Sequence, residues 1–225
     1  DGRVVLARSP ITVRHLLTHT SGLGYGPYLG HTEDLRAKEL HARLVRRATL
    51  GRTQPSDPGA ITSLDQWCNE LAKIPLEFHP GTAWLYGYGH DVAGHVLEVV
   101  SGEPLDALLR RRLFSPMGMS NTSFSLRFEC AKRCVGLYMR SGGKLVRGGD
   151  ARPSKSPWLA SNASPILSGG GGVEDSSAGL FSTSHDFTRF CLMLLNRGEI
   201  DGQRILNSES VAFLTSNQLP HVLGR

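Results

Sequence analysis

Apolar residues recur every three or four positions along most of the chain, the spacing that places them on one face of an α-helix. The first such stretch predicts a short helix that begins after Thr12, a residue suited to the N-cap, and ends at the Ser21-Gly22 turn. A longer helix is expected over 31–50, with Thr32 as its cap and a Gly- and Pro-rich loop over 51–59 behind it. The expected buried positions of these two helices are Val13, Leu16, Leu17, Leu35, Leu40 and Leu44.

The middle of the chain predicts three more helices. Ser63 and Gln66 have the spacing of a capping box, and the helix that they begin is expected to end near Pro75. Asp91 is expected to cap the next helix, and Pro104 to open the third, over 104–114. The expected buried positions are Leu64, Trp67 and Leu71 in the first of these helices and Val92, Val96, Val99 and Val100 in the second.

The last third of the chain mixes short strands with helices. Period-2 alternation predicts strands over 122–126 and 135–146, the second folded into a hairpin at Ser141-Gly142-Gly143-Lys144. A strong helix capped by Ser184 follows a long loop, and a turn at Asp201-Gly202 leads to a short final helix. The strong helix is expected to bury Phe187, Phe190, Leu194 and Leu195.

The composition is that of a globular protein with a hydrophobic core: 225 residues, of which 40% are hydrophobic and 20% charged. The net charge of +5 is scattered along the chain, apart from Arg110–Arg112 and the pair Arg46-Arg47. Nucleic acid is therefore not an expected partner. The longest uncharged stretch, 156–173, is broken by prolines and glycines, so no membrane-spanning helix is expected.

Four cysteines are too few for a disulfide scaffold. Cys68 and Cys191 fall on apolar helical faces, which predicts buried thiols. Cys130 and Cys134 have C-x-x-x-C spacing without a second pair, which favours ordinary thiols over half of a zinc site.

Two histidines have the spacing of metal ligands. His15 and His19 stand four positions apart on one expected helix, which lets two imidazoles meet one ion. No glutamate follows His15 in the zinc-protease pattern and no third ligand is indicated nearby. A structural or surface role is therefore favoured for the pair, and neither a metal nor a cofactor is predicted.

Several nucleophile and phosphate motifs are absent or poorly placed. The run GGGGVED lacks the lysine of a phosphate-binding loop, so a tight turn is the better interpretation, and no G-x-S-x-G surrounds Ser21 or Ser177. An S-x-x-K pattern occurs at Ser141 to Lys144, but catalysis by this pair needs both side chains on one helical turn. Two intervening glycines in a hairpin do not provide that geometry, so this match is not expected to be catalytic.

Three long blocks carry a resemblance to a known family. They are ITVRHLLTHTSGL, HPGTAWLYGYGHDVAGHVLEVVSGEPLDALLRRRLFSPMGMSNTSF and GGGGVEDSSAGLFSTSHDFTRFCLMLLNRGEIDGQRILNSESV. In this order they resemble the serine β-lactamase-related family, which groups class C β-lactamases, penicillin-binding proteins, D-aminopeptidases and family VIII carboxylesterases. The resemblance implies an α+β, β-lactamase/transpeptidase-like fold, here mainly its helical subdomain with an incomplete antiparallel sheet domain.

The resemblance also implies acyl transfer: a serine attacks an ester or amide carbonyl, and water or an amine releases the acyl-enzyme. Tyr86 falls on the family's tyrosine and is the expected general base and acid. Because a free phenol has a pKa near about 10, a nearby ammonium has to stabilise its phenolate or share its proton. By the same resemblance the turn from His19 to Gly22 and the stretch from Gly179 to Thr183 are scaffold, and Ser21 is not a nucleophile.

The motif around Tyr86 departs from the lactamase pattern. Tyr88 stands where lactamases have asparagine, and Gly87 where serine is common. The run from Tyr86 to Gly94 resembles the Y-S-x-A-x-D-V-L-G of the esterase branch, with Asp91 as a helix cap. Esters are therefore favoured over β-lactams as the small-molecule substrate.

The family's catalytic S-x-x-K helix lies N-terminal to the block containing His19 to Gly22, and its third motif lies C-terminal to the last predicted helix. Neither occurs in this sequence. Residues 1–225 are thus expected to form a partial domain that is inactive alone, with exposed apolar surface where the remaining strands would pack. A non-catalytic binding or scaffolding protein that retained the fold is the alternative, and the two differ in whether a longer gene product carries the serine and lysine.

Overall fold

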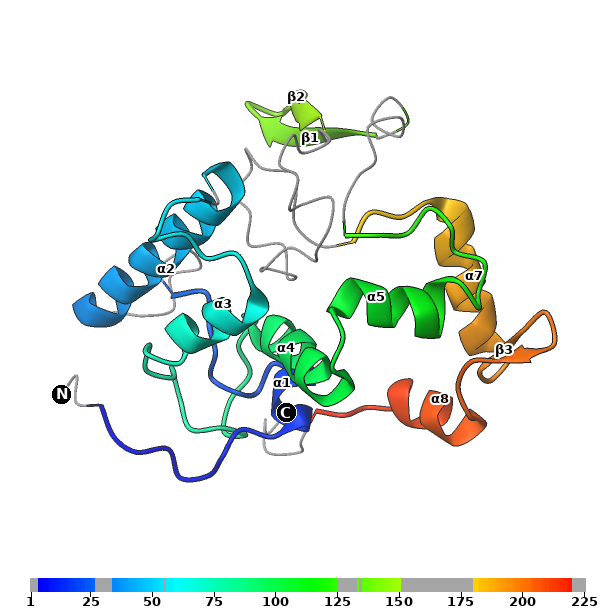
Figure 1. Cartoon of the computed structure of the whole chain (residues 1–225), viewed down its shortest axis with the longest axis horizontal. Helices are drawn as coiled ribbons and strands as arrows, with labels where there is room; N and C mark the ends of the chain where they lie inside the picture. The colour runs from blue at the N-terminus through cyan, green and yellow to red at the C-terminus, as the bar shows by residue number, and fades with distance from the viewer. Residues whose placement is uncertain are drawn as a thin grey trace. The chain divides into compact units, whose positions relative to one another are not determined.

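The computed structural model describes residues 4–26, 34–54, 56–124, 133, 135–150 and 180–219 (Figure 1). The described residues up to Val100, with those from Asn217, form one compact unit, and those between Ser101 and Ser216 form a second. None of the helices in the described residues combines the length and hydrophobicity that crossing a bilayer requires.

The first helix, α1 (Val13–Leu17), begins as predicted. The side chain of Thr12 accepts a hydrogen bond from the His15 backbone, and His15 Nδ1 accepts one from the Thr12 backbone at 3.3 Å. The prediction for its buried face was wrong for Val13 and Leu17, which are exposed, while Leu16 is buried. A helix of little more than one turn offers only one position to the core.

Helix α2 (Leu35–Thr53) begins later and ends later than predicted. Asp34 is its N-cap and accepts a hydrogen bond from the Ala37 backbone at 2.9 Å, whereas Thr32 lies outside the described residues. The helix continues through part of the expected loop over 51–59. Leu35 is exposed, contrary to prediction, because the buried face of α2 is set by positions 37, 41, 44 and 48.

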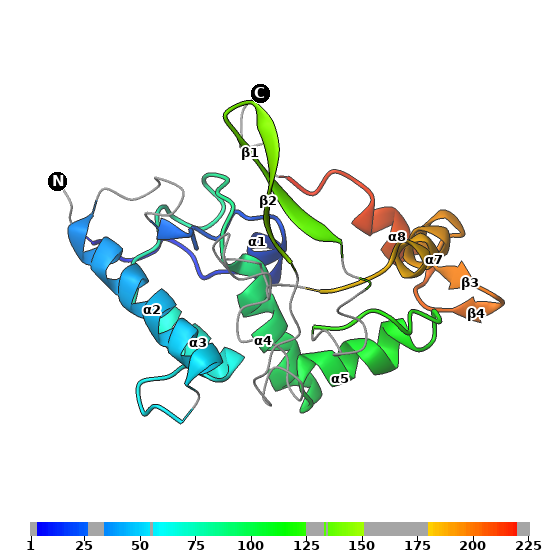
Figure 2. The same cartoon turned by 90° about the horizontal axis from the view of Figure 1, so that it is seen from above.

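Helix α3 (Leu64–Leu71) is the best predicted helix of the chain. Ser63 caps it, and its buried residues are Leu64, Trp67 and Leu71 as expected. The capping box is shifted by one residue, since Gln66 Oε1 accepts a hydrogen bond from the Thr62 backbone at 2.8 Å. Figures 1 and 2 show α2 and α3 side by side.

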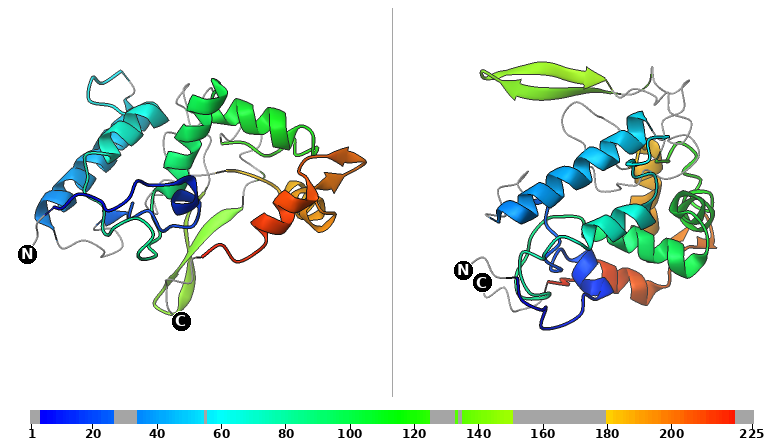
Figure 3. Two further views of the ribbon diagram at one scale, coloured as in Figure 1. Left: turned by 90° about the horizontal axis from the view of Figure 1, so that it is seen from below. Right: turned by 60° about the vertical axis from the view of Figure 1, so that its left-hand side comes forward.

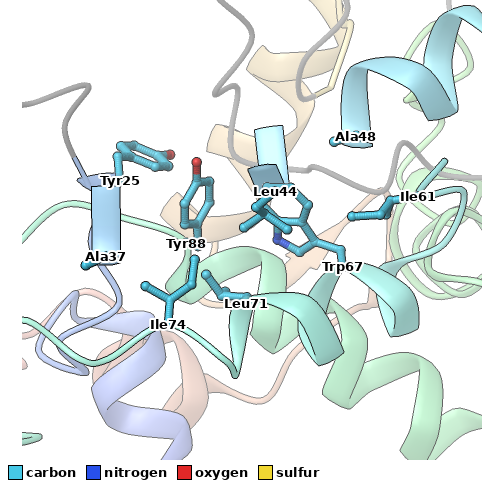
Figure 4. Packing of buried hydrophobic residues seen from close by; sticks show 9 residues of the cluster. All are labelled: Tyr25, Ala37, Leu44, Ala48, Ile61, Trp67, Leu71, Ile74 and Tyr88. Atoms are coloured by element: carbon cyan, nitrogen blue, oxygen red, sulfur yellow. The ribbon is translucent and has the colours of Figure 1, made fainter. Parts of the chain in front are cut away.

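The core of the first unit lies between these two helices and the segments that carry two tyrosines (Figure 4). Leu44 and Ala48 come from α2, and Trp67 and Leu71 from α3. The remaining members are Tyr25, Ala37, Ile61, Ile74 and Tyr88. The core therefore fixes Tyr88, two positions after Tyr86.

Helix α4 (Gly89–Ser101) buries a different face from the one predicted. Its buried residues are Gly89, Asp91 and Gly94, whereas Val99 and Val100 are 69% and 80% exposed. A side chain at Gly89 would overlap the carbonyl oxygen of Leu16, so close backbone approach selects this face. Asp91 lies inside the first turn instead of capping the helix.

In the second unit, α5 (Leu105–Leu109) continues directly into a π-helical turn, η2 (Arg110–Phe114), after Pro104. The Ser115 backbone donates to the Arg110 carbonyl at 2.8 Å, which is the longer spacing of a π turn. The core of this unit contains Phe114, Met117, Met119, Met193 and Ile200.

Helix α7 (Ser184–Leu195) is capped by Thr183, and not by Ser184 as predicted. Met193 and Asp186 are its buried residues. Of the positions predicted to be buried, Phe190 and Leu194 pack partly against the core, but Phe187 and Leu195 are exposed. Cys191 is also exposed, contrary to prediction, because it lies off the face that carries Met193.

Short β-hairpins and a final helix complete the second unit (Figure 3). Strands β3 (Glu199–Ile200) and β4 (Gln203–Arg204) turn at Asp201-Gly202 as predicted, and α8 (Ser208–Leu214) follows with Asn207 as its cap. Strands β1 (Gly136–Ser141) and β2 (Lys144–Asp150) confirm the predicted hairpin.

The strand expected over 122–126 is an isolated bridge between Ser123 and Phe181. Residues 125–132, including Cys130, lie outside the described part of the chain, as do Cys134 and the loop over 153–172 with its glycine run.

Candidate functional site

The backbone around Tyr86 is held against the segment that follows α1. The Leu85 backbone donates to the His19 carbonyl at 2.9 Å, and the Tyr88 backbone donates to the Leu23 carbonyl at 3.1 Å. An antiparallel bridge joins Gly24 to Gly87 between these bonds. Two segments more than sixty positions apart in sequence thus fix the backbone on both sides of Tyr86.

Gly87 is required by this pairing. A side chain there would overlap the Leu23 carbonyl oxygen and lie 2.8 Å from the Gly24 Cα. Only glycine allows two backbones to approach this closely. The departure from serine at this position therefore has a local structural reason.

The Tyr86 ring is 44% exposed and lies against two other aromatic rings. The His19 ring is 4.7 Å away between centroids, and the Tyr25 ring meets it edge-on at 5.4 Å. Trp84, two positions earlier in the same extended segment, is also about half exposed. The segment thus presents Trp84 and Tyr86 to solvent while His19 and Tyr25 support the second of them.

His19 lies at the centre of this group of rings. Besides Tyr86, its ring contacts His90 at 4.6 Å and Trp84 at 6.0 Å. Its Nδ1 is buried and has no hydrogen-bond partner among the described residues. Burial, and then the neighbouring His90, lower the pKa of His19, so the imidazole is neutral at pH 7.

The helical spacing that suggested His15 and His19 as a metal pair is absent from the folded chain. Helix α1 ends at Leu17, and the backbone of His19 is in the left-handed region, with φ of 56°. His15 and His19 are therefore not on one helix, and His15 serves in the capping box of α1. The described residues contain no group of three His, Cys, Asp or Glu side chains placed to hold a metal ion.

The residues between His19 and Gly22 are buried structural elements, in agreement with their expected scaffold role. Ser21 Oγ accepts a hydrogen bond from the Leu23 backbone at 3.3 Å, and Thr20 Oγ1 lies 2.9 Å from Thr18 Oγ1. Thr20 and Ser21 are almost fully inaccessible to solvent. Ser21 is thus out of reach of a substrate carbonyl.

Ser141 and Lys144, the S-x-x-K match, face each other across the β1–β2 turn. Both residues are exposed, and Gly142 and Gly143 have φ of 55° and 78°. This is the hairpin predicted from the two glycines, and it lacks the helical turn on which such a pair would act.

Tyr88, which stands where the lactamase pattern has asparagine, points into the core. Its ring meets Tyr25 edge-on at 4.4 Å and Trp67 at 5.1 Å, and it is buried. The position that carries asparagine in the lactamase pattern is therefore used for packing in this chain.

Sequence reasoning did not identify Tyr25 as a neighbour of Tyr86, nor Trp84 and His90 as neighbours of His19. One signal was present, since Trp84 and Tyr86 alternate with Leu85 in a period-2 pattern that indicates a shared face. Nothing local predicts Tyr25 or His19 there, because their contacts depend on how the chain turns after α1.

An open groove of about 930 Å³ lies elsewhere in the first unit. Its lining includes Arg43, Arg46 and Arg47 of α2 and the acidic Glu70 of α3, which forms an ion pair with Arg47 at 2.7 Å. Neither Tyr86 nor any residue in ring contact with it lines this groove. The groove is separate from the ring cluster around Tyr86.

Comparison with known proteins gives one family over nearly the whole chain. The family model described as Beta-lactamase matches residues 5–221. Lovastatin esterase from Penicillium rubens is 29% identical over 194 residues, which is 83% of this chain and 40% of that protein. Acyltransferase calJ from Penicillium decumbens is 27% identical over 95% of this chain and 44% of its own length.

Among solved structures, unliganded simvastatin synthase (LovD) from Aspergillus terreus superimposes with a TM-score of 0.63 at 24% identity. The match covers 97% of this chain and 45% of that one. The chain therefore spans less than half the length of the esterase, the acyltransferase and the synthase named here.

Proposed function

The chain belongs to the Beta-lactamase family and has the β-lactamase/transpeptidase-like fold, and from this premise we propose that it is part of a serine hydrolase that cleaves esters through an acyl-enzyme. An esterase and an acyltransferase are both among its relatives. Because those relatives are more than twice as long as the match, the proposal concerns a longer protein of which this chain supplies one section.

In this proposal Tyr86 is the general base and acid. The observation that carries the role is its half-exposed ring on a backbone held from both sides by the segment after α1. A group that exchanges protons with a substrate has to be both reachable and fixed in position. Tyr138 on the β1–β2 hairpin is exposed as well, but no ring of the described residues packs against it.

The proposed reaction begins at a serine supplied by another section of the protein. Its oxygen bonds to the ester carbonyl carbon while its proton passes to the Tyr86 phenolate oxygen. The tetrahedral intermediate then breaks the bond to the alkoxy group, which leaves with the proton from the phenol. Water repeats both steps on the acyl-enzyme and releases the carboxylic acid and the serine.

A phenolate at neutral pH requires a positive neighbour, because the pKa of a free phenol is about 10. In the family pattern this is the lysine three positions after the nucleophile. The one S-x-x-K of this sequence is at a hairpin turn, so we assign the lysine, like the serine, to another section of the protein.

Two observations support esters over β-lactams as substrates. The buried Tyr88 leaves no amide side chain at the third motif position. The name of lovastatin esterase states ester cleavage for a relative that matches 83% of this chain. A bulky ester is therefore the first substrate to test.

The experiment uses the complete gene product and a fluorophosphonate probe, which labels activated serines. Labelling is expected at a serine outside residues 1–225, and Tyr86→Phe is expected to slow it by about 100-fold or more. Tyr138→Phe, which changes an exposed tyrosine on the hairpin, is the matched control and should leave the rate unchanged. Equal rates for the native protein and Tyr86→Phe would exclude Tyr86 from the mechanism.

The same experiment tests the alternative of a non-catalytic protein. A complete gene product in which no serine is labelled, and in which no S-x-x-K precedes this section, would favour a binding or scaffolding role. The labelling rates of the native protein and of Tyr86→Phe would then carry no information about catalysis.

A further inference from the structure

We propose that His19 is a positioning residue whose imidazole ring holds the Tyr86 ring in its working orientation. Its significance for catalysis rests on the function proposed for Tyr86. The physical contact between the two rings does not depend on that function and can be tested separately.

The backbone at His19 would be more stable with glycine. The Thr20 backbone donates to the His15 carbonyl at 3.0 Å, which closes the end of α1 as a Schellman turn and places His19 at its left-handed position. A non-glycine residue is less stable than glycine in that conformation. The turn itself therefore gives no reason for an imidazole at this position.

Hydrogen bonding within the described part of the chain does not account for the His19 imidazole either. Its Nδ1 is buried without a partner among the described residues, so the ring does not cap a helix or close a loop through that atom. What the ring does instead is contact other rings: Tyr86 at 4.7 Å, His90 at 4.6 Å and Trp84 at 6.0 Å.

Backbone and side chain of His19 act on the same segment. The carbonyl of His19 accepts the hydrogen bond from Leu85, the residue before Tyr86, while the imidazole packs against the Tyr86 ring. The left-handed backbone is what allows one residue to make both contacts. Strain maintained at such a position points to a use for the side chain.

The neutral form of the ring suits this role. Burial, and then the neighbouring His90, lower the pKa of His19, which favours the neutral ring. A cation here would also stand beside the ammonium that the proposed reaction needs near Tyr86. A neutral ring fixes the phenol by packing, without a competing charge.

The test uses variants that keep the backbone conformation and remove the ring. His19→Gly and His19→Asn both suit a left-handed position, so each is expected to fold with a melting temperature equal to or above that of the native protein. In the complete gene product, each should lower kcat about tenfold with KM unchanged, because the loss is in orientation of the phenol. His19→Phe, which keeps a flat ring, should retain most of the activity.

Arg197→Gly is the matched control. Arg197 has φ of 55° and occupies the equivalent position after α7, where the Gly198 backbone donates to the Met193 carbonyl at 2.8 Å. The control is expected to leave kcat unchanged. Unchanged kcat in His19→Gly and His19→Asn, or an equal loss in Arg197→Gly, would overturn the proposal.

A readout without activity separates this inference from the function proposed above. The ring resonances of Tyr86 are assigned in the NMR spectrum of the complete gene product by comparison with Tyr86→Phe. In His19→Gly they are expected to lose their chemical-shift dispersion and to show faster ring flipping. Unchanged Tyr86 resonances would reject the contact itself, whereas changed resonances in a protein with no labelled serine would reject only the proposed function.

Discussion

Asp186, inside the first turn of α7, accepts a hydrogen bond at 2.9 Å from the hydroxyl of Thr122, which lies 64 positions earlier in the chain. The Asn121 backbone donates to the same carboxylate oxygen at 2.8 Å, and Asp186 is fully buried. These bonds attach the start of α7 to the turn that follows Met119. Next to them, Ser123 and Phe181 form the bridge in place of the predicted strand.

Replacing this carboxylate is expected to destabilise the second unit. Burial by itself raises the pKa of Asp186, but the hydrogen bonds from Thr122, Asn121 and His185 outweigh it and lower the pKa. Asp186→Asn should reduce the free energy of unfolding by about 1–3 kcal/mol at pH 7, measured in urea. Asp106→Asn, which removes a surface pair with Arg110, is the control and should cost about 1 kcal/mol or less.

The Asp186 carboxylate also predicts that the free energy of unfolding depends on pH. Because its folded pKa is depressed, the stabilisation is complete above the pKa of the unfolded chain, about 3.9, and is lost as the pH falls through the lower folded value. Urea midpoints between pH 5 and pH 2 should therefore decline in the native protein more than in Asp186→Asn. Parallel declines would mean that the pKa of this carboxyl group is the same in the folded and the unfolded chain.

Gly87→Ala is expected to disrupt the backbone pairing beside Tyr86. The added methyl group would overlap the Leu23 carbonyl oxygen, and neither backbone is free to move away without breaking the Gly24–Gly87 bridge. A loss of about 3 kcal/mol or more in unfolding free energy should follow. Gly102→Ala, where an added Cβ meets open space, should cost only about 1–2 kcal/mol from its left-handed backbone.

His41 predicts a second pH dependence, at higher pH. Its ring is buried on α2 and stacks near Tyr88 at 6.4 Å, and burial lowers its pKa. The unfolded chain then binds a proton more readily than the fold, so stability should fall as the pH drops from about 6.5 towards the lower folded pKa. His41→Phe should flatten this slope in thermal melts. His19, whose pKa burial also lowers, contributes a slope of the same sign, so His19→Asn should reduce the part that remains. A slope that is unchanged in His41→Phe would contradict the assignment.

The two described cysteines should differ in reactivity. Burial raises the pKa of Cys68 to about 12, with Asp91, Asp65 and Glu98 adding to the effect, so almost no thiolate forms at pH 8. Cys191 is exposed on α7. With Ellman's reagent on the native protein, Cys191→Ala should lose one rapidly reacting equivalent and Cys68→Ala none. A rapid equivalent lost in Cys68→Ala would show that its site opens to solvent.

Exposed valines at the end of α4 predict self-association of residues 1–225. Val99 and Val100 are adjacent and mostly exposed, and Val96 and Leu97 beside them are also accessible. Light scattering should show a mass that rises with concentration, and the double substitution Val99→Ser and Val100→Ser should reduce it. A monomer at all concentrations would count against this prediction.

Capping residues and turns were predictable because their signals are local. Thr12, Ser63 and the Asp201-Gly202 turn need only their own neighbours in sequence, and the structure confirms all three. The N-cap of α2 is Asp34, two positions after the predicted Thr32. The N-cap of α7 is Thr183, one position before the predicted Ser184. Such shifts are expected where several candidate caps stand side by side.

The buried faces of helices were less predictable. α4 offers more apolar residues than its core face can hold, and the side that packs carries the buried Gly89 and Gly94. At Gly89 the Leu16 carbonyl oxygen leaves no room for a side chain. Hydrophobic periodicity ranks these glycines as neutral, so it favoured Val99 and Val100. Which face of a helix is buried therefore depends on the segments that pack against it.

The candidate site also has one part that the sequence predicts and another part that it does not. Tyr86 was found by resemblance of its flanking residues to a family motif. The ring of His19 beside it depends on a left-handed turn at the end of α1, and that left-handed position is occupied by His19 itself and not by a glycine that would indicate it. Long-range contacts of this kind require the fold.

The π turn at Arg110–Phe114 is the last turn of its helix, and it sets the direction in which Phe114 points. It accommodates one more residue than a regular turn, and removal of a single arginine would rotate Phe114 by about 100° around the axis. Phe114 would then leave the methionine-rich interior that it now shares with Met117 and Met193. Length at this point is therefore as restrictive as side-chain identity, and an arginine there is more easily exchanged than deleted.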